Sequence, residues 1–270
     1  MGATPKLDLY LDDLGPRKTE ARADTRRNDG LDAFAFGGFL CRSEDAFGIG
    51  QTVSAFAERF KLSAPLHSAE IRGKRGNFEW LARAEPEWRS AFYEGLRDLL
   101  VSLPIHCILC AIDRPNYNSR FAQAHGDLRW RLLCRSAYPI VLERAAKFAD
   151  MQGRRLEVFL EECGKHEDRA VRQYHENLCQ NGQEFDPATS DRYQPMSAAD
   201  FSRIVIRKPR FIKKSNPLAQ VADLVLYPMV KSGYTLDYKP FLELEAAGKL
   251  TRSLSSEAQQ KCDLKYYCFK

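Results

Sequence analysis

The chain has 270 residues, with 41 Lys and Arg against 36 Asp and Glu and a formal net charge of +5. Hydrophobic residues make up 44% of it and include 16 Phe, enough for a full core, which excludes a wholly disordered protein. The sequence shows no apolar run of bilayer length and no basic-then-apolar signal pattern, so we expect a cytoplasmic protein that does not associate with membranes.

The 8 cysteines are scattered and lie mostly in apolar segments, which favours reduced core thiols over a disulfide framework. Cys107 and Cys110 form a C-x-x-C pair, but residues 105–112 around them predict a buried strand. Because no second pair stands at zinc-site spacing, core packing is the favoured interpretation of this pair.

Two strands are predicted near the start of the chain. Residues 7–15 alternate with period two and end in two acids and a glycine, and residues 33–41 follow after a charged connection. We expect the two strands to pair as an antiparallel hairpin, with Gly37 and Gly38 marking a bulge or a close neighbour.

Helices and a buried strand are predicted next. A short helix is expected over residues 51–60, whereas glycines and charges interrupt any period in residues 67–78. Pro86 opens a clear amphipathic helix. Its apolar stripe consists of Trp88, Phe92, Leu96, Leu99 and Leu103. The continuous apolar run at 105–112 predicts a strand buried on both faces.

Helices and strands also alternate in the predicted middle part of the chain. A loop carrying Pro115 leads to a long helix around residues 130–151, in which Pro139 predicts a kink or a break. Residues 156–164 repeat the pattern of the first strand, an apolar run followed by two acids and a glycine, and a helix is expected over 168–178. A polar loop is predicted over residues 181–200.

A buried helix with a single charged residue is predicted near the end of the chain. Residues 204–206 predict a short strand before it, Asn216 is a good N-cap, and Pro217 suits the first helical position. The helix is apolar on nearly every side and has one charge, Asp223, which needs an ion pair, hydrogen bonds or a metal ion. The chain after Gly233 looks less regular.

Acids stand at the ends of, or inside, three apolar elements. They are Asp12 with Asp13, Glu161 with Glu162, and Asp223. Any one of them alone would more often be a local cap or salt-bridge partner, but carboxylates gathered in one low-dielectric place repel unless a cation joins them. Oxygen-only ligands favour Mg²⁺ or Mn²⁺, and two such ions can activate water and stabilise a leaving oxygen. If a bulge shifts the alternation at the end of this strand, Glu162 would be the metal ligand in place of Glu161.

Basic residues flank these acids. Lys213 and Lys214 precede a helix N-terminus, where free N–H groups and the dipole attract phosphate, and Arg72 and Lys74 would hold the same backbone. The alternative is a solvated charged surface. His67 lies near a further candidate acid, Glu70, and would shuttle a proton at neutral pH; the alternative is a hydrogen-bonded surface histidine.

Five short motifs resemble, in order, those of domain-of-unknown-function family 3800, a bacterial and phage family regarded as RNase H-like. Residues 10–15 resemble its Y-x-D-E-S-G opening, and residues 67–72 and 112–114 match two further segments. Residues 161–168 echo its E-x-R-G-K-x-E-D motif, and residues 213–225 are similar to its K-K-S-N and L-Q-L-A-D-L motifs.

This resemblance implies an α/β fold with an RNase H-like core, a mixed sheet flanked by helices, in which several acids converge on metal. The acids carried over are Asp12, Glu70, Glu161 and Asp223. Leu14 and Cys163 depart from the family pattern, and the second removes an arginine that would touch phosphate.

The chain shows no internal repeat and no clear linker. We therefore expect a single RNase H-like domain over residues 1–270, with a core at about 7–234 and a C-terminal extension at 235–270.

The residues and the resemblance together predict a metal-dependent phosphodiesterase, or nuclease, that acts on nucleic acid. Asp12, Glu161 and Asp223 would bind Mg²⁺ or Mn²⁺, with two ions expected, and Glu70 would complete the catalytic site. One alternative is a non-catalytic module that binds nucleic acid or a partner on the same fold. Another is a phosphatase or nucleotide hydrolase that uses the same acids on a small substrate.

Overall fold

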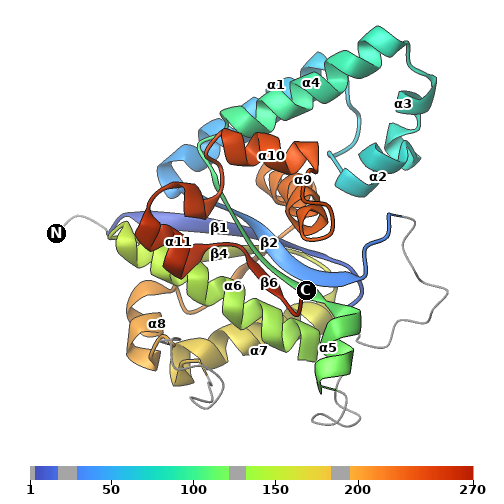
Figure 1. Ribbon diagram of the computed structural model, residues 1–270. Helices are drawn as coiled ribbons and strands as arrows, with labels where there is room; N and C mark the ends of the chain where they lie inside the picture. Colours follow the sequence, from blue (N-terminus) through green and yellow to red (C-terminus); the bar gives the residue numbers. More distant parts are fainter. Residues whose placement is uncertain (1–3, 18–28, 122–131, 184–194, 270) are drawn as a thin grey trace.

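The computed structural model describes residues 4–17, 29–121, 132–183 and 195–269. Their strands form one six-stranded mixed sheet with the order β5-β4-β1-β2-β3-β6, and helices pack on both of its faces (Figure 1). The strands are β1 (Lys6–Leu14), β2 (Ala33–Arg42), β3 (His106–Asp113), β4 (Arg155–Glu161), β5 (Arg210–Ile212) and β6 (Lys265–Tyr267). A mixed sheet flanked by helices is the architecture that the sequence predicts.

Strand directions in the sheet follow from the connections. The predicted hairpin is confirmed, since β1 pairs antiparallel with β2, and β2 pairs antiparallel with β3. β4 runs parallel to β1, and β5 runs parallel to β4, so the carboxyl ends of these three strands meet at one edge of the sheet. β6 adds a parallel strand beside β3.

One face of the sheet is covered by the helices drawn in the upper part of Figure 1. They are α1 (Ala46–Arg59), α2 (Ser68–Gly73), α3 (Trp80–Arg83), α4 (Pro86–Ser102), α9 (Pro217–Ser232) and α10 (Lys239–Ala246). The predicted buried helix is α9, and the side-chain oxygen of Asn216 caps it by accepting the N–H of Leu218 at 2.9 Å. α9 lies against β1 and β2.

The glycine pair in β2 allows that contact. A Cβ at Gly38 would lie 2.0 Å from the carbonyl oxygen of Tyr10 and 3.3 Å from the Cβ of Ala222 on α9. Of the two predicted reasons for the pair, a bulge and a close neighbour, the structure shows the second, because the β1–β2 register continues through both glycines.

The other face carries the second layer of helices. They are α5 (Arg114–Phe121), α6 (Leu132–Met151), α7 (Lys165–Asn181) and α8 (Ala198–Ile204), with α11 (Ser256–Cys262) packed beside α6. Among the helices of the described ranges, none combines the length and apolar character that a bilayer crossing demands.

The cysteine pair divides between the two faces. Cys107 belongs to the core under α9, whereas Cys110 belongs to the core under α6. Burial raises the pKa of both thiols to about 12, and all 8 cysteines are free. The pair is core packing, because thiols on opposite sides of a strand do not meet at one ion.

Several expected elements differ from the structure in the middle of the chain. The predicted loop at Pro115 is helix α5, because the carboxylate of Asp113 caps it by accepting the N–H of Asn116 at 2.9 Å. α6 continues through Pro139 without a break, with its buried residues holding it on the sheet. Trp130 lies outside the described residues. The stripe residue Trp88 is 47% exposed, because it lies in the first turn of α4, beyond the core.

Further differences lie later in the chain. The predicted strand at 204–206 is wrong, since Ile204 ends α8, which a capping box of Ser197 and Asp200 stabilises. Val205 makes only an isolated bridge, and the strand is β5. The predicted polar loop at 181–200 lies outside the described residues from 184 to 194, and it ends earlier than predicted, because α8 begins at Ala198. The tail after Gly233 is regular: it forms α10, α11 and β6.

Candidate functional site

Three acids from distant parts of the chain converge on one lysine. The Nζ of Lys214 lies 3.6 Å from a carboxylate oxygen of Asp12, 2.7 Å from one of Glu161 and 3.1 Å from one of Asp223. We call Asp12, Glu161 and Asp223 the acid trio. The sequence singled out all three acids, and the structure brings them together around an ammonium group.

The sheet explains this convergence. β1 and β4 are parallel neighbours in the register Leu11 opposite Leu160, so Asp12 and Glu161 follow at the same end of adjacent strands. β5 is parallel to β4 and leads over the same edge into α9. Lys214 lies on that connection, and Asp223 lies on α9 itself.

Asp223 finds the partners that its buried helix requires. Besides the ammonium group of Lys214, its Oδ2 accepts the backbone N–H of Ser68 at 2.8 Å. A second bond fixes the same segment, since the side-chain oxygen of Gln220 accepts the N–H of Leu66 at 2.9 Å. Residues 66–68 are therefore held to α9 directly beside the acid trio.

Burial and like charge shape the electrostatics of the acid trio. Burial raises the pKa of Asp12 to about 8, assisted by the charges of Asp223 and Glu161 and opposed by Lys214. Burial also raises the pKa of Glu161, opposed by Lys214, which donates a hydrogen bond to it. Burial alone would lower the pKa of Lys214, but the three acids reverse this and raise it. The ammonium group and the acids stabilise each other's charge.

The structure places Glu70 apart from the acid trio. Within the described residues, its side chain pairs with Nδ1 of His67 at 3.4 Å and accepts the backbone N–H of Asn77 at 3.1 Å. His67 lies next to the acid trio in the chain fold, since the residue that follows it, Ser68, donates its N–H to Asp223. The proximity of His67 and Glu70 that the sequence predicts is thus present at the border of the site.

The neighbouring acids Asp13 and Glu162 also lie outside the acid trio. Asp13 pairs with Arg17 at 2.8 Å, and its N–H donates to Oδ1 of Asp12. Glu162 is exposed, and its backbone N–H bonds to the carbonyl of Ile212. Glu161, and not Glu162, is the residue of this strand end that joins the acid trio.

The four basic residues predicted to hold phosphate have different surroundings. Lys214 points at the acid trio, whereas its neighbour Lys213 is exposed. Arg72 donates to the hydroxyl of Ser68 and lies over the ring of Tyr227, 3.2 Å from its centroid. Lys74 is exposed at the end of α2, with a left-handed backbone at φ 47°.

No group of three or more His, Cys, Asp or Glu side chains in the described ranges is arranged to hold a metal ion. The acid trio surrounds an ammonium group instead, at distances of 2.7–3.6 Å. Direct metal–oxygen bonds are shorter, about 2.0–2.6 Å for Mg²⁺ and Ca²⁺. The acid trio nevertheless offers carboxylate oxygens, which are the type of ligand atom that Mg²⁺ and Mn²⁺ prefer.

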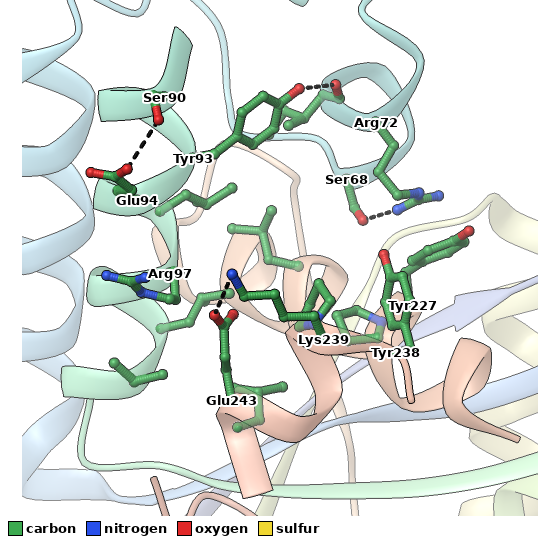
Figure 2. A pocket seen from close by; sticks show the side chains of 18 of the residues that line it. Ser68, Arg72, Ser90, Tyr93, Glu94, Arg97, Tyr227, Tyr238, Lys239 and Glu243 are labelled. Carbon is green, nitrogen blue, oxygen red and sulfur yellow. Dashed lines mark hydrogen bonds and ion pairs between the residues drawn. The ribbon is translucent and has the colours of Figure 1, made fainter. Parts of the chain in front are cut away.

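A second feature, which no sequence pattern indicates, lies next to the acid trio. A pocket of about 620 Å³ opens between α2, α4, α9 and α10 (Figure 2). Ser68 contributes to both places, because its N–H binds Asp223 and it also lines this pocket. Four helices from separate parts of the chain form the pocket, so it cannot be predicted from the periodicity of any one segment.

The chain is 30% identical over 262 residues to the uncharacterized protein y4pM of Sinorhizobium fredii (strain NBRC 101917 / NGR234). The match covers 96% of this chain and 94% of that protein. The chain belongs to the y4pM family. No family model and no solved structure matches it. The resemblance to family 3800 and the RNase H-like core remain predictions.

Proposed function

We propose that this member of the y4pM family is a metal-dependent phosphodiesterase that cleaves nucleic acid. The observation that carries the proposal is the convergence of Asp12, Glu161 and Asp223, from two strand ends and a helix, on a single cation. Nothing in the packing of an α/β core requires three acids at one point, and like charges gathered there are costly. Such a cluster is typical of a functional site.

The positions of the acids on the fold support the same proposal. The resemblance to family 3800 implies acids on a first strand, a later strand and a late helix of an RNase H-like core. β1, β4 and α9 carry them here, beside one another at the carboxyl edge of the sheet. Glu70, the fourth acid of the proposal, lies at the border of the site with His67.

Each side chain would have a distinct role. Asp12, Glu161 and Asp223 would hold Mg²⁺ or Mn²⁺, with two ions proposed, and a bound ion supplies water activation and stabilisation of the leaving oxygen. Lys214 holds the carboxylates together and, once turned away from them, would face the phosphate backbone. His67, paired with Glu70, would transfer a proton during cleavage.

Cleavage assays with matched variants test this function. The purified protein is incubated with single-stranded DNA, duplex DNA, RNA and an RNA–DNA hybrid, with Mg²⁺ or Mn²⁺. We expect cleavage of at least one substrate, and we expect Asp12→Asn to abolish it. Asp13→Asn is the control, because Asp13 pairs with Arg17 and not with Lys214. Absence of cleavage on every substrate with either ion would contradict the proposal.

A second candidate is a non-catalytic nucleic-acid-binding module. The observation that favours it is the ammonium group of Lys214, which already neutralises part of the charge of the acid trio without a metal. Thermal unfolding with and without Mn²⁺ separates the two functions, since an ion that binds only the folded state raises its stability. The enzyme should show a Mn²⁺-dependent rise that Asp12→Asn abolishes, whereas the module should bind nucleic acid with steep salt dependence and no rise.

A further inference from the structure

The pocket next to the acid trio has an apolar interior. It lies between α2, α4, α9 and α10, and its volume of about 620 Å³ is typical of sites that bury a small organic group. Its apolar lining includes Ile71, Leu96, Leu100, Val101, Leu224 and Leu244.

Aromatic rings and one guanidinium group form a wall of this pocket. Tyr227 and Tyr238 meet edge to face with ring centroids 6.1 Å apart, and the guanidinium of Arg72 lies over the Tyr227 ring. Tyr93 faces them from α4, and its hydroxyl donates to the carbonyl of Ile71 at 3.3 Å (Figure 2). Flat π-faces beside a cation are the chemistry that recognises a planar heteroaromatic ring.

The charges around the pocket favour an anionic ligand. Four cationic side chains line it, Arg72, Arg89, Arg97 and Lys239, against two acids, Glu94 and Glu243. Arg97 and Lys239 are exposed, so they lie where the pocket meets solvent. A ligand that combines a flat ring with a negatively charged backbone matches both the wall and the rim.

The pocket is connected to the acid trio through two short structural links. Ser68 lines the pocket while its N–H donates to Asp223, and Leu224, the next residue of α9, also lines it. Tyr227 follows Asp223 by four residues, which places it on the same helix face about 6 Å further along the axis. One strand of nucleic acid would therefore reach both places with adjacent nucleotides.

We propose that this pocket receives an unpaired nucleobase, which makes single-stranded nucleic acid, DNA or RNA, the substrate class of the site. The base stacks against Tyr238, because Arg72 covers the ring of the buried Tyr227, and the cations of the rim hold its backbone while the next phosphate lies at the acid trio. Bases inside a duplex are already stacked and paired and do not enter such a pocket without extrusion. The inference rests on the proposed function in taking the substrate to be nucleic acid.

Binding measurements test the pocket separately from cleavage. Fluorescence anisotropy is recorded with the Asp12→Asn protein and labelled oligonucleotides without divalent ions, as single-stranded DNA, single-stranded RNA and duplex DNA. We expect single strands of at least one type to bind more tightly than the duplex. Tyr238→Ala should weaken that binding about 5- to 150-fold, the range for loss of one base–aromatic stack, whereas Tyr238→Phe should keep it.

A charge variant with a matched control gives a second measurement. Lys239 and Lys261 are both exposed and both pair with a glutamate four residues away on their helix, Lys239 with Glu243 and Lys261 with Glu257, but only Lys239 lines the pocket. Lys239→Ala should weaken single-strand binding and lower the salt slope by about one, as expected for one lost phosphate contact. Lys261→Ala should leave both unchanged.

The outcomes separate the two proposals. Equal binding of duplex and single strands, or folded Tyr238→Ala and Lys239→Ala proteins that bind single strands as before, would overturn the pocket inference even if metal-dependent cleavage is found. Single-strand binding that depends on Tyr238 and Lys239, without cleavage under any ion, would support the pocket and overturn the nuclease.

Discussion

The Nζ of Lys214 lies 2.7 Å from a carboxylate oxygen of Glu161, a residue 53 positions away in the chain. This contact fixes the connection between β5 and α9 against the end of β4. It also places a cation at the point where Asp12 and Asp223 meet. Lys214 and the acid trio thereby form one ion-pair network.

Removing that cation should destabilise the protein and increase its response to metal. In Lys214→Met the three carboxylates keep their positions without a counter-charge. We expect a loss of about 1–3 kcal/mol in the free energy of unfolding without metal, less than for a fully buried pair because 25% of the side chain is exposed. Mn²⁺ should raise the melting temperature of this variant more than that of the wild type. Lys213→Met, at the exposed neighbouring position, should change neither quantity; an unchanged stability of Lys214→Met would contradict the role of the ammonium group.

Loss of Asp223 should loosen α2. Asp223→Ala removes the acceptor of the Ser68 N–H and one partner of Lys214. A buried N–H left without an acceptor costs about 1–3 kcal/mol, so urea unfolding should show a loss of this size. Hydrogen exchange at residues 66–71 should accelerate more than in the sheet. Asp237→Ala, at an exposed position beyond α9, is the control, and equal exchange rates in both variants would argue against the anchoring bond.

Two glycine substitutions should have opposite effects. Gly38→Ala would place a Cβ 2.0 Å from the carbonyl oxygen of Tyr10, which forces β1 and β2 apart beneath α9. We expect a loss of at least about 3 kcal/mol, at the severe end for single substitutions. Gly50→Ala, inside α1, meets its nearest neighbour at 3.7 Å and should raise stability by about 0.5–1 kcal/mol. Chemical denaturation measures both; a tolerated Gly38→Ala would contradict the close packing of the two strands.

Stability should fall in mild acid because of His175. Its Nε2 lies 2.9 Å from the carbonyl oxygen of Ile206 and donates to it, so its Nδ1 accepts the hydroxyl hydrogen of Tyr138 at 2.7 Å. Burial lowers the pKa of this histidine below its ordinary value of 6.5. Below pH 6.5 the unfolded chain therefore binds a proton that the folded protein does not, and the free energy of unfolding falls by up to about 1.4 kcal/mol per pH unit.

Denaturation at several pH values checks this contribution. His175→Gln should flatten the fall below pH 6.5, while lowering the stability at pH 8. His166→Gln changes an exposed histidine on the same helix and should leave the profile as in the wild type. A wild-type profile in His175→Gln would show that another group causes the acid sensitivity.

Local features could be predicted from the sequence, because they depend on residues that are close together in the chain. Asn216 and Pro217 defined the start of α9, alternation defined β1, and the apolar surroundings of Asp223 indicated that this acid needed a partner. Local patterns failed where distant contacts decide the outcome. β6 exists because β3 offers it a free edge. The strand predicted at 204–206 is wrong for a local reason instead, since the capping box at Ser197 begins α8, which ends at Ile204.

For the site, the sequence by itself determined which acids stand at element ends and that a cation had to accompany them. Only the tertiary structure decided that Lys214 is that cation, that Glu70 accepts the N–H of Asn77 and stays outside the acid trio, and that four helices enclose a pocket beside the trio. The physical reason is the range of the forces involved. Capping and periodicity act within a few residues, whereas ion pairs and cavities depend on how strands and helices far apart in the chain pack together.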